Sequence, residues 1–398
     1  MRKRKLYDRL LKESKTDKIS IIIGPRQVGK TTLLRQLHEE LGGLFVDLDI
    51  LENAEKFETY TKALQYLKVE GYDENEPFFV FFDEFQKYKD ISLVLKNLYD
   101  NHKNIKMYAT GSSSLRIKDE IQESLAGRKF LHTLLPLDFE EFLFFKNHDM
   151  KRFERVKNSG LGVQKDYLIL LEEFMIYGGY PEVVTSKDKT DILRSIFDTY
   201  IKKDLVDFLS SSEVLGMKKL IQYLAINNAN KLNLLDISNQ LALSRHKLEG
   251  YLQILEETYI IHRLVPYFKN KNKEIVKAFK EFFIDTGVRN YFCNNFNHLM
   301  KREDSGFLFE SFVTSEIKKN SEYDVKFFDD IKKHEVDIVV DKVSSQIALE
   351  VKYKKEIKSS DFRGLEAIGN NIENKYIVSL GNQTAHTLSP FLVPDLFR

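Results

Sequence analysis

The 398-residue sequence contains a single cysteine, Cys293. One thiol excludes a disulfide framework and a zinc site built from several cysteines, and it suits a reducing compartment. Runs of about eighteen apolar residues are also lacking, so we expect no membrane-spanning helix and no membrane partner. Residues 1–9 are charged and have no apolar core behind them, which predicts no signal peptide. These absences together predict a cytoplasmic protein.

An excess of charge of either sign is absent as well. Sixty-one Lys and Arg residues against sixty Asp and Glu residues leave a net charge of +1. Contact with DNA or RNA must therefore come from local basic patches, and the charge count neither favours nor excludes such a partner. Hydrophobic residues make up 42% and charged residues 30%, which is typical of a soluble globular chain long enough for two or three domains.

A phosphate-binding loop motif stands near the N-terminus. The β-branched run 21–23 predicts a strand, the leucine spacing of 32–41 predicts a helix, and the residues between them match G-x-x-x-x-G-K-[ST]. Glycines let successive N–H groups face a phosphate, and the helix adds the positive end of its dipole. The alternative is a chance glycine-rich turn. We expect contacts with ATP from Gly24, Pro25, Arg26, Gln27, Val28, Gly29, Lys30, Thr31 and Thr32.

Within that loop, Lys30 is expected to reach the β- and γ-phosphates, and the Thr31 hydroxyl to ligate Mg²⁺. The apolar run 78–82 reads as a strand buried on both faces and ends in Asp83 and Glu84. Carboxylates at such a strand end emerge where ligands bind, so we assign Asp83 to Mg²⁺ and Glu84 to the water that attacks the γ-phosphate. An ordinary strand end is the alternative.

Two further segments of this domain carry weaker signals. Residues 110–114, after the strand 105–109, either orient the attacking water or cap the next helix. Arg128 precedes a fifth strand at 129–135. It either stabilises charge during phosphoryl transfer, in its own chain or across a homo-oligomer boundary, or it is an ordinary surface arginine.

These motifs carry a family resemblance. The loop at 24–32, the acids at 83–86, the strand tip at 110–113, and residues 127–128 with 136–142 resemble the AAA-type ATPases of bacteria and archaea whose C-terminal domain is of unknown function. The similarity extends through the rest of the chain. The resemblance implies an AAA-like ATPase domain whose acid-tipped strand lies close to the loop strand.

The middle of the chain predicts a winged-helix-like region. Residues 220–226, 235–241 and 248–255 have helical spacing, 242–244 makes a short turn, and strands are expected at 259–268 and 280–284. In a DNA reader, Arg245, His246 and Lys247 at the start of the third helix would face the major groove. A packing lid or a protein contact is the alternative.

The last part of the chain places acids inside apolar patterns. Asp337 lies in a strand over 335–340, Glu350 and Lys352 share a strand over 347–353, and Glu310 lies in a helix. Buried strand acids need a partner or a metal, so Asp337 and Glu350 would converge on one Mg²⁺, with Lys352 beside it, to activate water against a phosphodiester. The alternative is a structural cross-strand ion pair. This pattern resembles the PD-(D/E)XK nuclease-like fold, although Val336 replaces the usual proline. The resemblance puts Glu310 in the position of the helix acid of that fold and implies that it is a further metal ligand.

We therefore predict an α/β protein with three domains. These are a P-loop ATPase domain with an AAA-like parallel sheet at 1–145, a helical and winged-helix-like region at 146–300, and a small α/β nuclease-like domain at 301–398. The leading hypothesis is Mg²⁺-dependent ATP hydrolysis coupled to binding or cleavage of DNA or RNA. The rival is a nucleotide-controlled switch or interaction protein whose last domain does not cleave.

Overall fold

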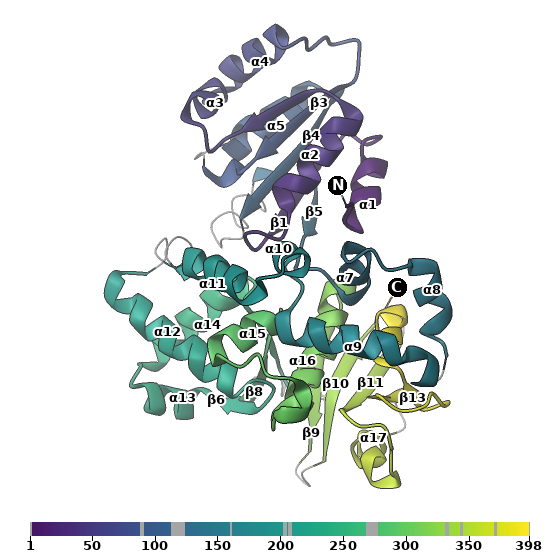
Figure 1. Cartoon of the computed structure of the whole chain (residues 1–398). Helices are drawn as coiled ribbons and strands as arrows, with labels where there is room; N and C mark the ends of the chain where they lie inside the picture. Colours follow the sequence, from purple (N-terminus) through teal and green to yellow (C-terminus); the bar gives the residue numbers. More distant parts are fainter. Residues whose placement is uncertain are drawn as a thin grey trace. The chain divides into compact units, whose positions relative to one another are not determined.

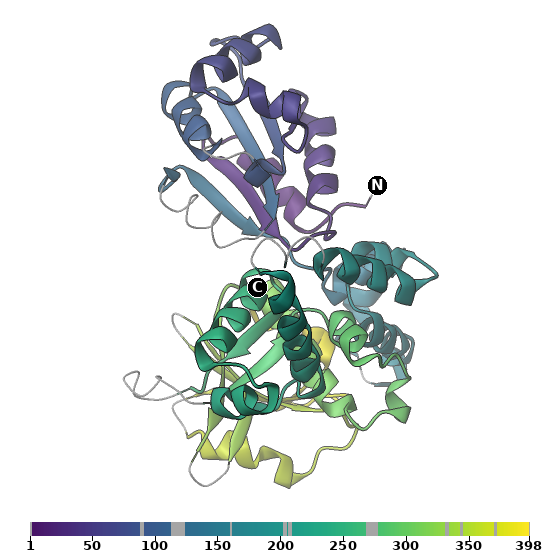
Figure 2. The same ribbon diagram turned by 90° about the vertical axis from the view of Figure 1, so that its left-hand side faces the viewer.

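The computed structural model describes residues 2–87, 91–112, 124–159, 161–201, 205, 209–267, 278–330, 334–342, 345–369 and 372–397 (Figures 1 and 2). Its contacts divide the chain into a first unit, residues 1–135 with 257–259, and a second unit, residues 136–256 with 260–398. Each unit is described by itself, and the finer division into three domains stays a prediction. Within the described residues, no helix is both long and apolar enough to cross a membrane.

The first unit is built on a parallel five-stranded sheet in the order β2-β3-β4-β1-β5. This confirms the predicted α/β fold. Because all the strands run the same way, their carboxyl ends meet at one edge, which is where ligands bind in such sheets. The strands are β1 Ile19–Gly24, β2 Leu44–Asp47, β3 Phe78–Asp83, β4 Ile105–Ser112 and β5 Lys129–Thr133.

Helices cover both faces of this sheet, as the two ribbon views show (Figures 1 and 2). Neighbouring strand residues point to opposite faces, so Phe81 stacks on Tyr108 on one face while Phe82 joins the core under α4 and α5 on the other. The helix α1, which the sequence did not predict, accepts a 3.0 Å hydrogen bond from the Tyr108 hydroxyl at Leu10 O. The helices are α1 Leu6–Glu13, α2 Lys30–Leu41, α3 Leu51–Lys56, α4 Tyr60–Val69 and α5 Ile91–Asn101, with a 3-10 turn, η1, at Phe85–Lys87.

The second unit begins with helices that pack around a glycine-rich turn. Gly178 has a left-handed φ of 77°, and the Gly179 N–H donates a 2.7 Å hydrogen bond to buried Asp285. A Cβ on Gly287 would lie 2.1 Å from Tyr177 O, so the backbones meet too closely for a side chain there. The helices of this region are α7 Phe139–Phe145, α8 Met150–Val156, α9 Leu161–Tyr177, α10 Pro181–Thr185, α11 Lys189–Thr199 and α15 Thr286–Cys293.

Three helices and a small antiparallel sheet follow in the middle of the chain. The sheet has the order β6-β8-β7; β7 falls within the strand predicted at 259–268, and β8 overlaps the strand predicted at 280–284 but begins two residues earlier. The residues predicted to join them, 270–273, lie outside the described residues. The elements are α12 Ser211–Ile226, α13 Leu234–Leu241, α14 Arg245–Glu257, β6 Lys231–Asn233, β7 Ile261–Leu264 and β8 Ala278–Phe283.

The C-terminal sheet has the order β13-β12-β11-β10-β9 and is covered on both faces. Ile338 and Val340 join the apolar cluster under α16, whereas Val339 joins the cluster under α17. Strand β10 pairs antiparallel with β9 and β11, and β12 pairs parallel with β11 and β13. The elements are η4 Leu299–Lys301, α16 Ser305–Asn320, β9 Asp324–Asp329, β10 Glu335–Asp341, β11 Gln346–Lys352, η5 Ser359–Phe362, α17 Arg363–Ala367, β12 Asn374–Ser379, β13 Thr387–Leu388, η6 Pro390–Leu392 and η7 Pro394–Phe397.

Candidate functional site

The phosphate-binding motif forms a tight loop between β1 and α2. Gly29, the N-cap of α2, has a φ of 95°, which glycine adopts without strain. Gly24 is also required, because a Cβ there would lie 2.1 Å from Leu134 O. Lys30 is the first residue of α2 and is 5% exposed; its Nζ donates to Gly24 O at 2.9 Å and to Pro25 O at 2.7 Å. The lysine therefore folds over the loop that would hold the phosphates.

Arg4 makes a hydrogen bond to the loop, a role that the sequence analysis did not predict. Its guanidinium donates 2.7 Å and 2.8 Å hydrogen bonds to Val28 O and Leu135 O, and the residue is 8% exposed. A lone arginine in a basic N-terminal stretch carries no signal for such a role. The two carbonyls that it binds lie 24 and 131 residues along the chain.

The two predicted Mg²⁺ ligands of the ATP site, Thr31 of the loop and Asp83 at the end of β3, lie together. The Thr31 hydroxyl donates a 3.2 Å hydrogen bond to Asp83 Oδ1, and Asp83 is 4% exposed. Strand β4 lies between the loop strand β1 and the acid-tipped strand β3, and its Thr110 hydroxyl also donates to Asp83 Oδ1. Thr110 is thus a polar neighbour of the acid, while Ser113 and Ser114 of the same predicted segment lie outside the described residues.

Glu84 follows β3 with a left-handed φ of 53°. A non-glycine residue in this region costs of the order of 1 kcal/mol, and such residues cluster at functional sites. Its carboxylate accepts a hydrogen bond from the Gln86 amide. A Cβ on Gly111 would lie 2.8 Å from the Gln86 Oε1, so a glycine at the tip of β4 leaves room for this amide.

Arg128 lies away from the phosphate-binding loop of its own chain. Lys129, at the start of β5, pairs with Ile19 at the start of β1, whereas the loop follows the other end of β1. The guanidinium makes 2.7 Å and 3.1 Å hydrogen bonds to Asp100. Of the two roles predicted for Arg128, in its own chain or across a subunit boundary, this placement does not bring the guanidinium to the loop of its own chain. Action across a subunit boundary stays a prediction.

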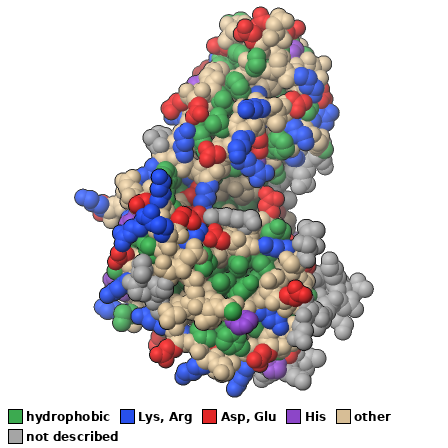
Figure 3. All heavy atoms as spheres, turned by 90° about the vertical axis from the view of Figure 1, so that its right-hand side faces the viewer, with side chains coloured by type: hydrophobic (Ala, Val, Ile, Leu, Met, Phe, Trp, Pro, Cys, Tyr) green, Lys and Arg blue, Asp and Glu red, His purple; other side chains and the backbone are tan. Residues whose placement is uncertain are grey.

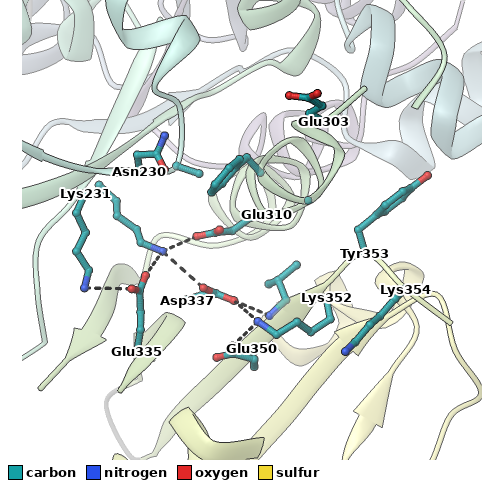
Figure 4. Close-up of a pocket in the computed structure, with 15 residues that line it drawn as sticks. Asn230, Lys231, Glu303, Glu310, Glu335, Asp337, Glu350, Lys352, Tyr353 and Lys354 are labelled. Carbon is teal, nitrogen blue, oxygen red and sulfur yellow. Dashed lines mark hydrogen bonds and ion pairs between the residues drawn. The ribbon is translucent and has the colours of Figure 1, made fainter. Parts of the chain in front are cut away.

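The predicted acids of the C-terminal part line one cavity of about 710 Å³ (Figure 4). Glu310 comes from α16, Asp337 from β10 and Glu350 from β11, and each is at most 9% exposed. Ile338 pairs with Leu349, which sets Asp337 and Glu350 side by side at the next position. Lys352 lies 2.5 Å from Glu350 Oε1 and 3.9 Å from Asp337 Oδ2.

The pairing of β10 with β9 shifts register between Val336 and Val339, the stretch that contains Asp337. Such bulges re-aim side chains and are common beside functional sites. One Asp337 oxygen accepts a 2.8 Å hydrogen bond from Val351 N. Glu350 Oε2 is buried and has no hydrogen-bond partner among the described residues.

Lys280, on β8, was missed and changes the expected arrangement. Its Nζ lies 2.8 Å from Glu310 Oε1, 2.6 Å from Glu335 Oε1 and 3.6 Å from Asp337 Oδ1. Among the described residues, no three carboxylate, imidazole or thiol groups are gathered so that they could hold a metal ion. Glu310 therefore does not converge with Asp337 and Glu350 as a third metal ligand, because the Lys280 ammonium group lies next to both Glu310 and Asp337.

Burial and mutual repulsion raise the affinity of two of these acids for protons. Burial, followed by the charge of Asp337, raises the pKa of Glu350 to about 7 even though Lys352 opposes the shift. The same two causes raise the pKa of Glu310 to about 8 against the opposing charge of Lys280. Burial lowers the pKa of Lys280, but the three carboxylates outweigh it and raise that pKa well above its usual value.

The next residue on β8, Glu281, points to the opposite face and is fully buried. Neither of its carboxylate oxygens has a hydrogen-bond partner within the described part of the chain. Burial raises its pKa, and the charge of Arg289 opposes that shift.

The basic residues at the start of α14 are engaged with acids. Arg245 lies 3.0 Å from Glu249, and Lys247 lies 3.1 Å from Glu213. His246 is exposed. On the face of the first unit drawn in Figure 3, acidic and basic side chains are interspersed.

Comparisons with known proteins identify the N-terminal domain. Residues 16–143 match a family described as an AAA domain, and this match, with the parallel sheet and its loop, makes the N-terminal part an AAA-type P-loop ATPase domain. Residues 169–299 and 305–393 match two further families, each described as a domain of unknown function, DUF8612 and DUF4143.

The chain also resembles whole proteins. It is 27% identical over 296 residues to an uncharacterized protein of Haemophilus influenzae, which covers 71% of each chain. The structure of the Walker-type ATPase PABY2304 of Pyrococcus abyssi has a TM-score of 0.49 at 16% identity and covers 73% of this chain and 96% of that one. The uncharacterized protein MJ1544 of Methanocaldococcus jannaschii is 30% identical over 339 residues, which are 81% of this chain and 72% of that protein. The chain therefore belongs to the same family as MJ1544.

Proposed function

We propose that the first unit binds ATP with Mg²⁺ and hydrolyses it. The observation that carries this proposal is the meeting of Thr31, Asp83 and Thr110 beside the loop that begins α2. The Thr31 hydroxyl and the Asp83 carboxylate are hard oxygen donors that suit Mg²⁺, which when bound offsets the phosphate charge. Lys30 would exchange its contacts with two loop carbonyls for the β- and γ-phosphates.

Glu84 is the base in this proposal. Its carboxylate accepts a proton from the water that attacks the γ-phosphorus, while the bond from that phosphorus to the bridging oxygen of ADP breaks. The Gln86 amide holds the Glu84 carboxylate by a hydrogen bond and so fixes its direction.

Two variants test this assignment. Lys30→Ala is expected to abolish binding of a fluorescent ATP analogue. Glu84→Gln is expected to bind it as the wild type does and to release phosphate at least about 100-fold more slowly. The exposed residue Glu52 supplies a matched control, since Glu52→Gln should behave as the wild type. Wild-type turnover in Glu84→Gln would refute the base assignment.

A second candidate function concerns the acidic cavity, where Asp337, Glu350 and Lys352 favour chemistry on a phosphodiester of DNA or RNA. The unpartnered Glu350 Oε2 and the neighbouring Asp337 carboxylate would hold one divalent cation, whose chemistry is to make bound water more acidic. Lys352 supplies positive charge next to the same two acids. In this proposal, ATP occupancy of the first unit controls access to the cavity.

The test is cleavage of single- and double-stranded DNA and RNA by the full chain with Mg²⁺ or Mn²⁺. Lys352→Ala should lose cleavage, whereas Lys355→Ala, a change at an exposed lysine three residues on, should retain it. If the wild type nicks none of these substrates, and Lys352→Ala behaves identically, the rival function gains: a nucleotide-controlled switch whose last part does not cleave.

A further inference from the structure

The acidic cavity has a cation of its own. Lys280 is 3% exposed, and its ammonium group lies within 3.6 Å of carboxylate oxygens on Glu310, Glu335 and Asp337. Glu310 and Glu335 lie within hydrogen-bond distance of this ammonium group, and Asp337 at 3.6 Å adds a third negative charge. Figure 4 shows the three labelled acids directed toward one point, where dashed lines join them. The strand that carries Lys280 belongs to the small middle sheet and not to the sheet that carries Asp337.

The two sides of Asp337 are different. Its Oδ1 faces Lys280, while its Oδ2 lies near Lys352 and accepts the Val351 N–H. On this second side, Glu350 is 8% exposed and its Oε2 has no hydrogen-bond partner in the described part of the chain. A buried carboxylate oxygen without a partner is costly, so Glu350 Oε2 is the oxygen of this cluster that a bound cation would stabilise most.

Ammonium groups and divalent cations compete for the same carboxylate oxygens. A metal ion could enter among Glu310, Glu335 and Asp337 only by displacing Lys280, which would then be a buried charge without partners. Lys231, at the rim, adds a further 3.0 Å contact to Glu335. The chain itself therefore supplies the cation for Glu310, Glu335 and the Asp337 Oδ1, whereas on the other side Lys352 pairs with Glu350 Oε1 and leaves Oε2 without a hydrogen-bond partner among the described residues.

We propose that Lys280 is the built-in cation of the acidic cavity, so that it excludes a divalent metal from the position formed by Glu310, Glu335 and Asp337. The cavity then holds one divalent position, at Asp337 and Glu350, and Glu310 is not a metal ligand. The single divalent position at Asp337 and Glu350 rests on the proposed phosphodiester chemistry. The exclusion of a metal by Lys280 does not depend on that proposal.

The test counts Mn²⁺ ions bound by the full, nucleotide-free chain, measured by the electron paramagnetic resonance signal of free Mn²⁺. Lys280→Met should bind one more Mn²⁺ than the wild type. Lys231→Met is the matched control, because it removes the same charge from the same partner Glu335 at the rim; it should bind the wild-type number. Equal numbers for Lys280→Met and the wild type would overturn the exclusion.

Loss of Lys280 leaves buried acids unpaired, so the variant is also followed by thermal unfolding. A Lys280→Met protein that folds only when Mn²⁺ is added supports the proposal, and one that Mn²⁺ does not rescue counts against it. Glu310→Gln gives a second arm with Lys280 in place. It should change the Mn²⁺ affinity of the wild-type position less than about threefold, whereas Glu350→Gln should weaken it at least tenfold.

The outcomes separate this inference from the proposed function. A wild type that binds no Mn²⁺ defeats the metal site at Asp337 and Glu350, but a gain of one ion in Lys280→Met would still support exclusion by Lys280. Equal weakening in Glu310→Gln and Glu350→Gln would make Glu310 a ligand and overturn the inference, while leaving phosphodiester chemistry standing.

Discussion

The Thr110 hydroxyl donates a hydrogen bond to Asp83 from the strand next to it. Thr110 is fully buried, so this bond orients a carboxylate that water cannot reach freely. We expect Thr110→Val to raise the Mg²⁺ concentration needed for half-maximal ATPase activity about tenfold, with ATP affinity changed less than about threefold. The measurement is phosphate release over a Mg²⁺ titration.

Thr133, at the exposed end of β5, supplies the control for this change. Thr133→Val should titrate with Mg²⁺ as the wild type does. A wild-type titration for Thr110→Val would mean that the hydroxyl only fills space at the strand tip.

Arg4 should act on ATP affinity rather than on turnover. Arg4→Met removes two hydrogen bonds to backbone carbonyls next to the loop, a loss of about 1 to 3 kcal/mol for bonds from a charged group. We expect ATP binding to weaken about tenfold, and kcat at saturating ATP to stay within about threefold. Titration of fluorescent nucleotide measures the first, and phosphate release the second.

Arg9, whose side chain is 63% exposed, is the matched position for comparison. The prediction fails if Arg9→Met and Arg4→Met weaken ATP binding equally, because the effect would then follow from the lost charge and not from the loop contacts.

Arg128 should show its role through protein concentration. Because its guanidinium binds Asp100 at the edge away from the loop, Arg128→Ala should leave the kcat of dilute, monomeric protein within about twofold of wild type. If Arg128 acts across a subunit boundary, the wild type gains activity as protein concentration rises and Arg128→Ala does not. A large loss of activity in the dilute variant would contradict the placement described above.

The sequence predicted the parts of the site that depend on local order. The residue types of two short segments suffice to predict the loop and the acid-tipped strand: the apolar run before Gly24 with its spacing to Lys30, and the acids after Phe82. Lys280 and Arg4 could not be found this way, because each acts on residues brought near only by the folded chain; Lys280 meets acids 30 to 57 positions later. Helix α1 was missed because half of its eight residues are charged and its apolar face is short.

The close backbone contact at Gly287 predicts a large loss of stability. An alanine Cβ would lie 2.1 Å from Tyr177 O, and both segments are buried, so the helices must separate. Gly287→Ala should lower the free energy of unfolding by about 3 kcal/mol or more. Urea unfolding followed by circular dichroism measures this change.

Gly250 in α14 has room for a side chain, because nothing lies within 4 Å of a Cβ built there. Gly250→Ala should stabilise the protein by about 0.5 to 1 kcal/mol through helix propensity. Equal effects of the two substitutions would show that the contact at Gly287 relaxes without cost.

Asp304 gives the fold a defined pH dependence. Burial alone would raise its pKa, but hydrogen bonds from Arg302 and the charge of Arg289 outweigh burial and lower the pKa from 3.8 to about 2. Because the pKa is lower in the folded state, the stabilisation is present above about pH 4 and is lost as the pH falls toward 2. Asp304→Asn should cost roughly 2 kcal/mol at pH 7 and about half as much at pH 3.

Chemical unfolding at several pH values between 3 and 7 checks this dependence. Asp191, whose side chain is 71% exposed beside Arg194, is the control, and Asp191→Asn should change stability by less than about 0.5 kcal/mol throughout. A constant difference between wild type and Asp304→Asn at every pH would rule out the electrostatic origin.

Strand β8 carries opposite charges on neighbouring residues, and both of its faces are buried. A strand that slips by one residue exchanges its two faces. In β8, that slip would place Glu281 among Glu310, Glu335 and Asp337, and Lys280 on the face of Arg289. Glu281 would then face three carboxylates and Lys280 would face Arg289, so like charges would meet on both faces. Burial of a misaligned β8 would be unfavourable for this reason. Charge therefore enforces the pairing register of this strand, and the acidic cavity forms only in a chain that has aligned it correctly.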